Sequence, residues 1–441
     1  KKWDKKFPVN KNHISWQAYN VSERICNLIT FFCIFDKKFN LNNNQLKFVE
    51  NFLDKHARYL INHLEIPYTK IVNNHILNNF RALYILSQVS ANCYLSDLSK
   101  VIFKHYFKKI ISSNGFLNEG SVHYQFIVTK WFLEIATVSD IYNDIKFSVL
   151  IKEKCDKLLK SCECFSYSST NKNIKFPLIG DVSPDCPVNW FQPFIKNVGW
   201  NKLWKFENNS IKSKYKNFQQ DGWFKNTFGK FTCFGFLHPN QRYYPYGHGH
   251  DDYSSICLFY DEIPILIDTG TETYDLNLTK KCEENKAKHS IFKINDNNLV
   301  FSGLGINAFK SSYCLDKLTN KISKDKIEFK GLTLDNIKWS RTLFYSKYNK
   351  LTFIDKCLPV NTIKGQFIIN NKISFQSRHK NQFIFKAKNL EIYFIFSSKA
   401  KVKLKKIPIF KSYGIKKNTF SLNYYSNEAT VKTQIKINNL L

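Results

Sequence analysis

Apolar residues in the first half of the chain recur at the spacing of helix faces. Between residues 49 and 64 they fall at i, i+3 and i+4 positions, and similar stripes occupy residues 76–84 and 122–135. This spacing places apolar side chains on one face of an α-helix. Helical patterns continue to about Leu159, and no long strand pattern interrupts them. We therefore predict an all-helical N-terminal part built from stacked helix hairpins.

The second half of the chain has a different pattern. Residues 177–187 are rich in turn formers and end the helical pattern, since Pro and Gly interrupt helices. Short runs of β-branched and aromatic residues then follow one another, at residues 231–237, 254–260, 263–267, 327–329, 342–345, 351–354, 366–369, 383–385 and 391–396. Such a series is typical of an antiparallel sandwich. We predict two domains, a helical one over residues 1–205 and a strand-rich one over residues 215–441.

Composition adds a large positive charge to this picture. The chain has 441 residues, of which 43% are hydrophobic, so it is not a disordered tail protein. Its 66 Lys and Arg against 35 Asp and Glu give a net charge of +31, which predicts an anionic partner. No usual nucleic-acid-binding motif occurs, and the apolar run at residues 25–35 is too short for a membrane span.

Polar residues that could carry chemistry are densest at residues 243–252. His248 and His250 stand two apart, and we expect them to point to opposite sides, so that they need not share one role. Gly247 and Gly249 let the backbone approach a ligand closely. The alternative interpretation is a polar turn with solvated histidines.

A candidate metal site combines residues that are far apart in the chain. Asp268 ends an apolar strand pattern and His289 precedes another. With His250 they form a nitrogen and oxygen donor set that suits zinc. The spacing alone equally allows a capped strand end with two ordinary histidines.

Two helix starts in the first half carry more polar residues than capping requires. One of the pair Asn73 and Asn74 can cap the first helix, and Ser121 can cap the second. Capping leaves His75 and Tyr124 unexplained. A neutral amide can hydrogen-bond a substrate carboxylate, and a Tyr in a first helical turn can face a cleft and transfer a proton.

Taken together, these segments resemble the heparinase II/III-like polysaccharide lyases, with alginate lyases of similar build. The family motifs that these segments resemble are W-x-x-Y-x-x-S-x-R-I-x-N at residues 16–27, N-N-H at 73–75, E-x-S-x-x-Y at 119–124, H-G-H-x-D-x-x-S at 248–255, the strand end D-P-G-T-Y-x-Y at 268–274 and A-H-N at 288–290. The chain departs from the family pattern at Thr269, Glu272 and Ser290. Because Glu272 stands where the family has a Tyr, Tyr274 is the remaining candidate there.

The resemblance implies an N-terminal incomplete α/α toroid followed by a C-terminal antiparallel β-sandwich, with a cleft between them. It implies β-elimination on an anionic polysaccharide that contains uronic acid. Asn74, with His75, would neutralise the uronate carboxylate. Tyr124 would act as base and acid, and His248 as the base for the opposite uronate epimer. The further substrate-binding residues that it implies are Glu119, Arg24 and Tyr274.

The same resemblance implies a structural Zn²⁺ held by His250, Asp268 and His289.

The residues themselves leave two other classes of function open. A glycoside hydrolase would need a pair of carboxylates across the sugar ring, and no spacing singles out such a pair. A non-catalytic protein of bacterial exopolysaccharide or capsule metabolism would need a decayed site. A periplasmic or secreted location is expected if a signal peptide has been removed, and a cytoplasmic one otherwise.

Overall fold

The structure is a computed structural model, and its description covers residues 2–35, 41–67, 73–167, 176–182, 186, 215–237, 248–250, 252–271, 288–295, 318–333, 335–346, 348–412 and 415–440. The chain groups into two compact units. The helical unit comprises Lys1–Asn118 and Ile127–Lys160, and the strand-rich unit comprises Glu119–Phe126 and Ser161–Leu441. The predicted order of helices first and strands second is confirmed. The predicted boundary stays a prediction, because residues 201–214 lie outside the described part.

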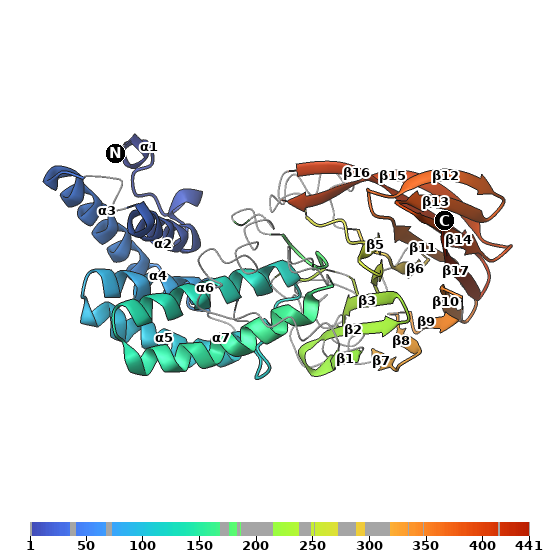
Figure 1. Ribbon diagram of the computed structural model, residues 1–441, viewed down its shortest axis with the longest axis horizontal. Coiled ribbons are helices and arrows are strands. Elements are labelled where there is room, and N and C mark those ends of the chain that lie inside the picture. The colour runs from blue at the N-terminus through green and yellow to red at the C-terminus, as the bar shows by residue number, and fades with distance from the viewer. Residues whose placement is uncertain are drawn as a thin grey trace. The chain divides into compact units, whose positions relative to one another are not determined.

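Seven α-helices are described (Figure 1). They are α1 (Lys2–Lys6), α2 (Ala18–Phe35), α3 (Asn43–Asn62), α4 (His75–Val89), α5 (Cys93–Ile110), α6 (Val122–Ile141) and α7 (Ile145–Phe165), with a 3₁₀ turn, η1, at Ile14–Trp16. Helix α4 packs against both α2 and α5, and its residues from Ile76 to Ser87 are all buried. A helix that is buried on every face is the centre of its unit.

A buried guanidinium lies within this helical core. Arg81 of α4 is fully buried and binds Glu23 of α2 at 2.7 Å and Glu134 of α6 at 2.6 Å. Lys130 holds the other oxygen of Glu134 at 3.0 Å. An isolated buried charge is very costly, so each partner requires the others. Three helices are thereby fixed in register with one another.

The strand-rich unit holds short strands. They are β1 (Tyr215–Phe218), β2 (Trp223–Phe228), β3 (Phe231–Phe236), β4 (Cys257–Tyr260), β5 (Ile263–Leu266), β6 (Phe292–Ile294), β7 (Thr319–Ile322), β8 (Lys326–Leu332), β9 (Lys338–Ser346), β10 (Lys350–Leu358), β11 (Ile363–Ile368), β12 (Ser374–His379), β13 (Gln382–Ala387), β14 (Leu390–Phe396), β15 (Lys401–Ser412), β16 (Ile415–Ser426) and β17 (Thr430–Asn439). Each of the strand runs that the sequence predicts coincides with one of these strands or overlaps it.

The described strands form three antiparallel sheets (Figure 1). Their orders are β1-β2-β3-β4-β5, β12-β13-β14-β17-β10-β9-β8-β7 and β15-β16-β11-β6. Buried and less buried residues alternate along β14 and β17, so one face of each strand is directed into the protein. One hydrophobic cluster takes residues from all three sheets, among them Phe231, Phe367 and Phe394.

Among the helices of the described chain, none has the length and apolar character that a bilayer span requires. Nine cysteines have described side chains, and these are free thiols that are all buried except Cys93.

His56 makes the helical unit sensitive to acid. Its ring is stacked on Trp16 at 4.8 Å, and its Nδ1 lies 2.7 Å from the carbonyl oxygen of Phe52. Burial lowers the pKa of His56 from 6.5 to about 4. Below pH 6.5 His56 is therefore protonated in the unfolded chain but not in the folded chain, and the free energy of unfolding falls until about pH 4. The loss amounts to about 3 kcal/mol.

We expect His56→Phe to keep the ring stack and to remove this loss. The melting temperature of the variant should exceed that of the wild type increasingly as the pH is lowered from 6.5 to 4.5. Thermal unfolding followed by circular dichroism measures the difference, with His105→Phe on the surface of α5 as the control. A constant offset across this pH range would contradict the assignment.

Candidate functional site

The start of α6 is held by a serine cap. The hydroxyl of Ser121 accepts a hydrogen bond from the backbone N–H of Tyr124 at 3.2 Å and donates one to the carbonyl oxygen of Asp181 at 2.8 Å. The N–H of Val122 donates to Ile179 at 3.0 Å. The predicted cap is confirmed, and it fixes Tyr124 in the first turn beside residues 179–181.

Tyr124 and His248 form the closest ring pair of the site. Their centroids are 3.5 Å apart and their planes differ by 9°. The two imidazole nitrogens of His248 face two carboxylates, since Nε2 lies 3.5 Å from Glu119 and Nδ1 lies 3.3 Å from Asp181. The structure thus brings together three of the residues that the sequence singled out, Tyr124, His248 and Glu119.

Asp181 joins the two histidines of the candidate site. One of its oxygens lies 3.3 Å from His248 Nδ1, and the other lies 2.8 Å from His250 Nε2. Thr271 donates its hydroxyl proton to Asp181. Burial alone would raise the pKa of Asp181, but the hydrogen bonds from His248 and His250 lower it far below its ordinary value. Asp181 is therefore an anion that orients both rings.

Sequence analysis missed Asp181 and misjudged how its two histidines point. Both side chains reach the same carboxylate and do not point to opposite sides. Residues two apart share one face even in an extended segment, so the expectation was wrong on geometry. In the sequence Asp181 is one of several polar residues in a turn-rich segment. The only feature of the sequence that could have drawn attention to Asp181 is the glycine before it, Gly180.

Two glycines allow this close approach of three segments. Gly180 has φ +79°, and a Cβ there would collide with the carbonyl oxygen of Gly120 and lie 2.7 Å from that of His248. A Cβ on Gly120 would lie 2.8 Å from the Cα of Gly249. A side chain at either position would separate Asp181 from the start of α6.

A second polar group lies deeper in the strand-rich unit. Asp252, Asp268 and His289 are buried, and one ligand atom of each lies within 4.8 Å of the others. His289 Nδ1 is 2.6 Å from Asp268 Oδ1. Two carboxylates and an imidazole are donors that suit a divalent metal such as zinc.

The expected ligand His250 lies next to this group. Its ring centroid is 5.1 Å from that of His289, and its Nδ1 is buried without a hydrogen-bond partner in the described part of the chain. An orphaned imidazole nitrogen is an observation that fits a fourth metal ligand. The structure therefore brings Asp268 and His289 together as expected and adds Asp252, which the sequence analysis did not assign to the metal.

Asn74 and His75 lie in the helical unit, at the start of α4. Asn73 accepts the hydrogen bond from the His75 N–H at 3.1 Å, whereas Asn74 occupies the N-cap position with no side-chain capping bond. His75 Nδ1 lies 2.7 Å from Glu65, and its ring lies 4.8 Å from that of Tyr19. Capping thus uses Asn73, as the sequence analysis allowed.

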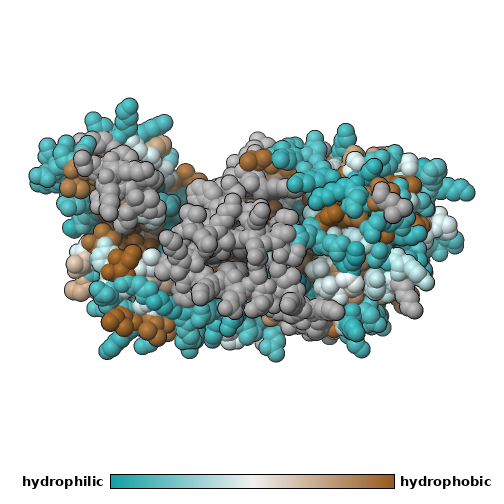
Figure 2. All heavy atoms as spheres, in the orientation of Figure 1, coloured by the Kyte–Doolittle hydropathy of each residue, from teal (hydrophilic) through white to brown (hydrophobic). Residues whose placement is uncertain are grey.

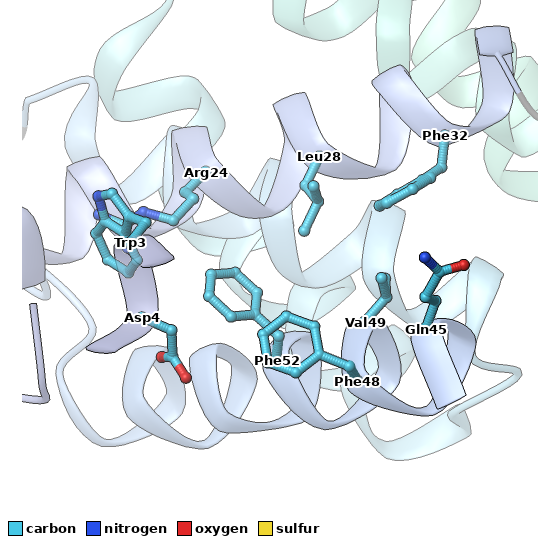
Figure 3. Close-up of a pocket in the computed structure, with 9 residues that line it drawn as sticks. All are labelled: Trp3, Asp4, Arg24, Leu28, Phe32, Gln45, Phe48, Val49 and Phe52. Carbon is cyan, nitrogen blue, oxygen red and sulfur yellow. The ribbon is translucent and has the colours of Figure 1, made fainter. Parts of the chain in front are cut away.

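Arg24 lies in the wall of a pocket of about 590 Å³ between α1, α2 and α3 (Figure 3). Its guanidinium carbon is 4.1 Å from the ring centroid of Trp3, and it donates to the carbonyl oxygen of Ser15. Burial lowers its pKa from 12.5 to about 10. Its substrate-binding role stays a prediction, and Tyr274 lies outside the described residues.

Solved structures provide the comparison for the fold. No protein-family model and no curated protein matches the sequence. A crystal structure of heparinase III aligns with a TM-score of 0.76 at 17% identity and covers 100% of this chain and 72% of its own. Heparan sulfate lyase HepC from Pedobacter heparinus aligns with a TM-score of 0.63 at 13% identity, over 99% of this chain and 71% of its own. The chain therefore has the fold of heparinase III, and the resemblance drawn from the motifs is confirmed at that level.

Gly180→Ala tests the packing that holds Asp181. We expect it to lower the free energy of unfolding by more than about 2 kcal/mol, because backbone strain and steric conflict add. Thermal and denaturant unfolding measure the loss. Gly229→Ala is the control for strain, since Gly229 has φ +57° and a Cβ there would meet only the side chain of Tyr345. Equal losses in the two variants would show that the contacts with Gly120 and His248 carry no energy.

Proposed function

We propose that this protein is a polysaccharide lyase that cleaves an anionic, uronate-containing polysaccharide by β-elimination. The main observation in support is that the rings of Tyr124 and His248 are stacked. The two imidazole nitrogens of His248 also face the carboxylates of Glu119 and Asp181. Such a ring is oriented before any substrate binds, which lowers the entropic cost of catalysis. The fold of heparinase III supports this proposal.

The reaction requires one base and one acid. The C5–H bond of the uronate breaks, its electron pair forms the C4=C5 double bond, and the C4–O bond to the leaving sugar breaks. Tyr124 would take the C5 proton and return a proton to the leaving oxygen. His248 would act as the base for the opposite C5 epimer. A neutral imidazole and a tyrosine phenolate both accept protons, so Tyr124 would act as base in its ionised form, and the centroids of the two rings lie 3.5 Å apart.

The developing negative charge needs compensation at the uronate carboxylate. We assign this to Asn74 and His75, because hydrogen bonds to that carboxylate stabilise an enolate-like anion. Glu65 would hold the His75 ring through its Nδ1. Glu119, Arg24 and Tyr274 remain proposed substrate-binding residues.

The proposal extends to the finer architecture and the cofactor. We assign the helical unit to an incomplete α/α toroid and the strand-rich unit to an antiparallel β-sandwich, within the domains 1–205 and 215–441. The metal group would hold a structural Zn²⁺ through Asp268 and His289, with His250 or Asp252. Zinc there would brace the segments that carry His248 and His250 and would take no part in the proton transfers.

We expect Tyr124→Phe to abolish elimination. The measurement is the absorbance of the conjugated double bond across a panel of heparan-type, chondroitin-type and alginate-like chains. The loss should reach about a thousandfold, since a phenyl ring cannot transfer a proton. Tyr94→Phe on the surface of α5 is the control. Release of reducing ends without the absorbance would favour a glycoside hydrolase, and neither signal with any chain would favour a non-catalytic polysaccharide-binding protein.

Metal removal tests the second part of the proposal. A chelator should lower the melting temperature of the wild type by several degrees, because ligand binding to the folded state stabilises it by mass action. Added Zn²⁺ should restore the melting temperature. His289→Gln should show neither response, and elemental analysis should find less zinc in it. A wild type without bound metal and without a chelator response would contradict the zinc assignment.

A further inference from the structure

The pocket of about 590 Å³ between α1, α2 and α3 lies within the helical unit (Figure 3). Its long walls are formed by residues three or four apart on two helices, namely Arg24, Leu28 and Phe32 of α2 and Phe48, Val49 and Phe52 of α3. This spacing places side chains on one face of a helix, so two helix faces are directed at the pocket. A pocket of this size, with a mostly apolar lining and few polar groups, is typical of a site for a small ligand.

Arg24 forms a charged end of this pocket. Its guanidinium lies against Trp3 (Figure 3), and its Nη2 donates a hydrogen bond to the carbonyl oxygen of Ser15. Its Nη1 is buried and has no hydrogen-bond partner among the residues that the structure describes. Because a buried donor without an acceptor is costly, the guanidinium has a donor left for a ligand.

The charges of the lining favour a ligand with one anionic group. Asp4, the acid of the lining, is paired with Lys55 of α3. In the described part of the chain Arg24 forms no ion pair with an Asp or Glu, so its positive charge is not compensated. A guanidinium binds a carboxylate through two parallel hydrogen bonds, and a carboxylate is therefore the group that suits this end.

The rest of the lining suits an alkyl chain better than a sugar. Among the nine described residues that line the pocket, Gln45 supplies the one amide group, and six others are aliphatic or aromatic. The hydroxyl groups of a sugar would lose their hydrogen bonds to water in such a lining and gain few in return. An alkyl chain gains about fourfold in affinity for each methylene that is buried.

The length of the pocket indicates the length of the chain. Arg24 with Trp3 lies at one end, Phe32 with Gln45 lies at the other, and Leu28 lies between them (Figure 3). Arg24 and Phe32 are eight residues apart on α2, so their Cα atoms are about 12 Å apart at a rise of about 1.5 Å per residue. A medium-chain fatty acid spans a distance of this order.

We propose that the pocket between α1, α2 and α3 binds a medium-chain fatty acid, with its carboxylate at Arg24 and its alkyl chain along Leu28 toward Phe32. The proposal goes beyond the proposed function and does not rest on it, since none of the residues assigned to proton transfer lines the pocket. The substrate contact proposed for Arg24 rests on the motif resemblance alone. The apolar lining gives this side chain a different ligand, and the experiment separates the two.

Binding is measured by calorimetry with hexanoate, octanoate and decanoate. We expect one saturable site, with an affinity that rises about fourfold for each added methylene. Decanol should bind at least about tenfold more weakly than decanoate, because it cannot form a charge-assisted pair with the guanidinium. Decanoate should also raise the melting temperature, since it binds the folded state.

Two variants of the pocket locate the site. Leu28→Trp fills the middle of the pocket and should weaken decanoate binding at least about tenfold, and hexanoate binding less. Leu46→Trp is the matched control, because Leu46 is an exposed residue of α3 outside the lining, and it should change the affinity less than twofold. Arg24→Gln should reduce the affinity for decanoate to that for decanol. Circular dichroism verifies that each variant is folded, and the comparison of decanoate with decanol in the wild type needs no variant.

Several results would overturn the proposal. They are the absence of saturable binding of all three acids, equal affinities for decanol and decanoate, and equal effects of Leu28→Trp and Leu46→Trp. Displacement of decanoate by heparin oligosaccharides would also overturn it and would assign the pocket to the polysaccharide. Absence of elimination in a protein that binds decanoate as expected would contradict the proposed function alone.

Discussion

The strand-rich unit depends on one buried guanidinium. Arg341 of β9 is fully buried and makes a two-point contact with Asp355 of β10, at 2.7 and 3.1 Å. Nη2, one of the two nitrogens in that contact, also donates to the hydroxyl of Tyr424 of β16 at 3.1 Å, and Nη1 donates to the carbonyl oxygens of Ser254 and Ser290. An unpaired buried charge costs several kcal/mol, so these groups must assemble together. Two sheets and two loops are thereby fixed by one side chain.

The two loops fixed in this way carry Asp252 and His289, two of the three residues of the candidate metal group. Ser254 follows Asp252 by two residues, and Ser290 follows His289 directly. Arg341 contacts the carbonyl oxygens of Ser254 and Ser290 and no metal-ligand atom. These contacts nevertheless fix the backbone close to the ligand side chains of Asp252 and His289. The core thus determines the geometry of the group before any metal binds, which is the general way in which outer partners orient ligands. Asp181 likewise orients side chains of the site, because one of its oxygens contacts His250 and the other contacts His248.

Periodicity predicted the order of helices and strands because side-chain burial in this chain follows local pattern closely, as along β14. The motifs also identified Tyr124, His248 and Glu119, whose grouping the structure shows. Asp181 and Glu65 were not predicted, since a carboxylate that acts by orienting a histidine needs only to be near it in space. The expectation that His248 and His250 point to opposite sides was wrong, because residues two apart share one face of an extended segment. That both rings meet Asp181 could not be predicted, since the acid comes from a segment far away in the sequence.

The lysines that give the chain its positive charge differ in their surroundings. Along β15, exposed Lys401 and Lys403 alternate with apolar residues, and the view in Figure 2 shows hydrophilic residues gathered over β15 and β16. Lysines of this kind cost little, because water solvates each one separately. Lys364 differs, because it lies directly opposite Lys293 on the neighbouring strand and its Nζ lies 5.9 Å from the ring centroid of Tyr425. The charge of Lys364 is therefore positioned by contacts within the sheet and not by water alone.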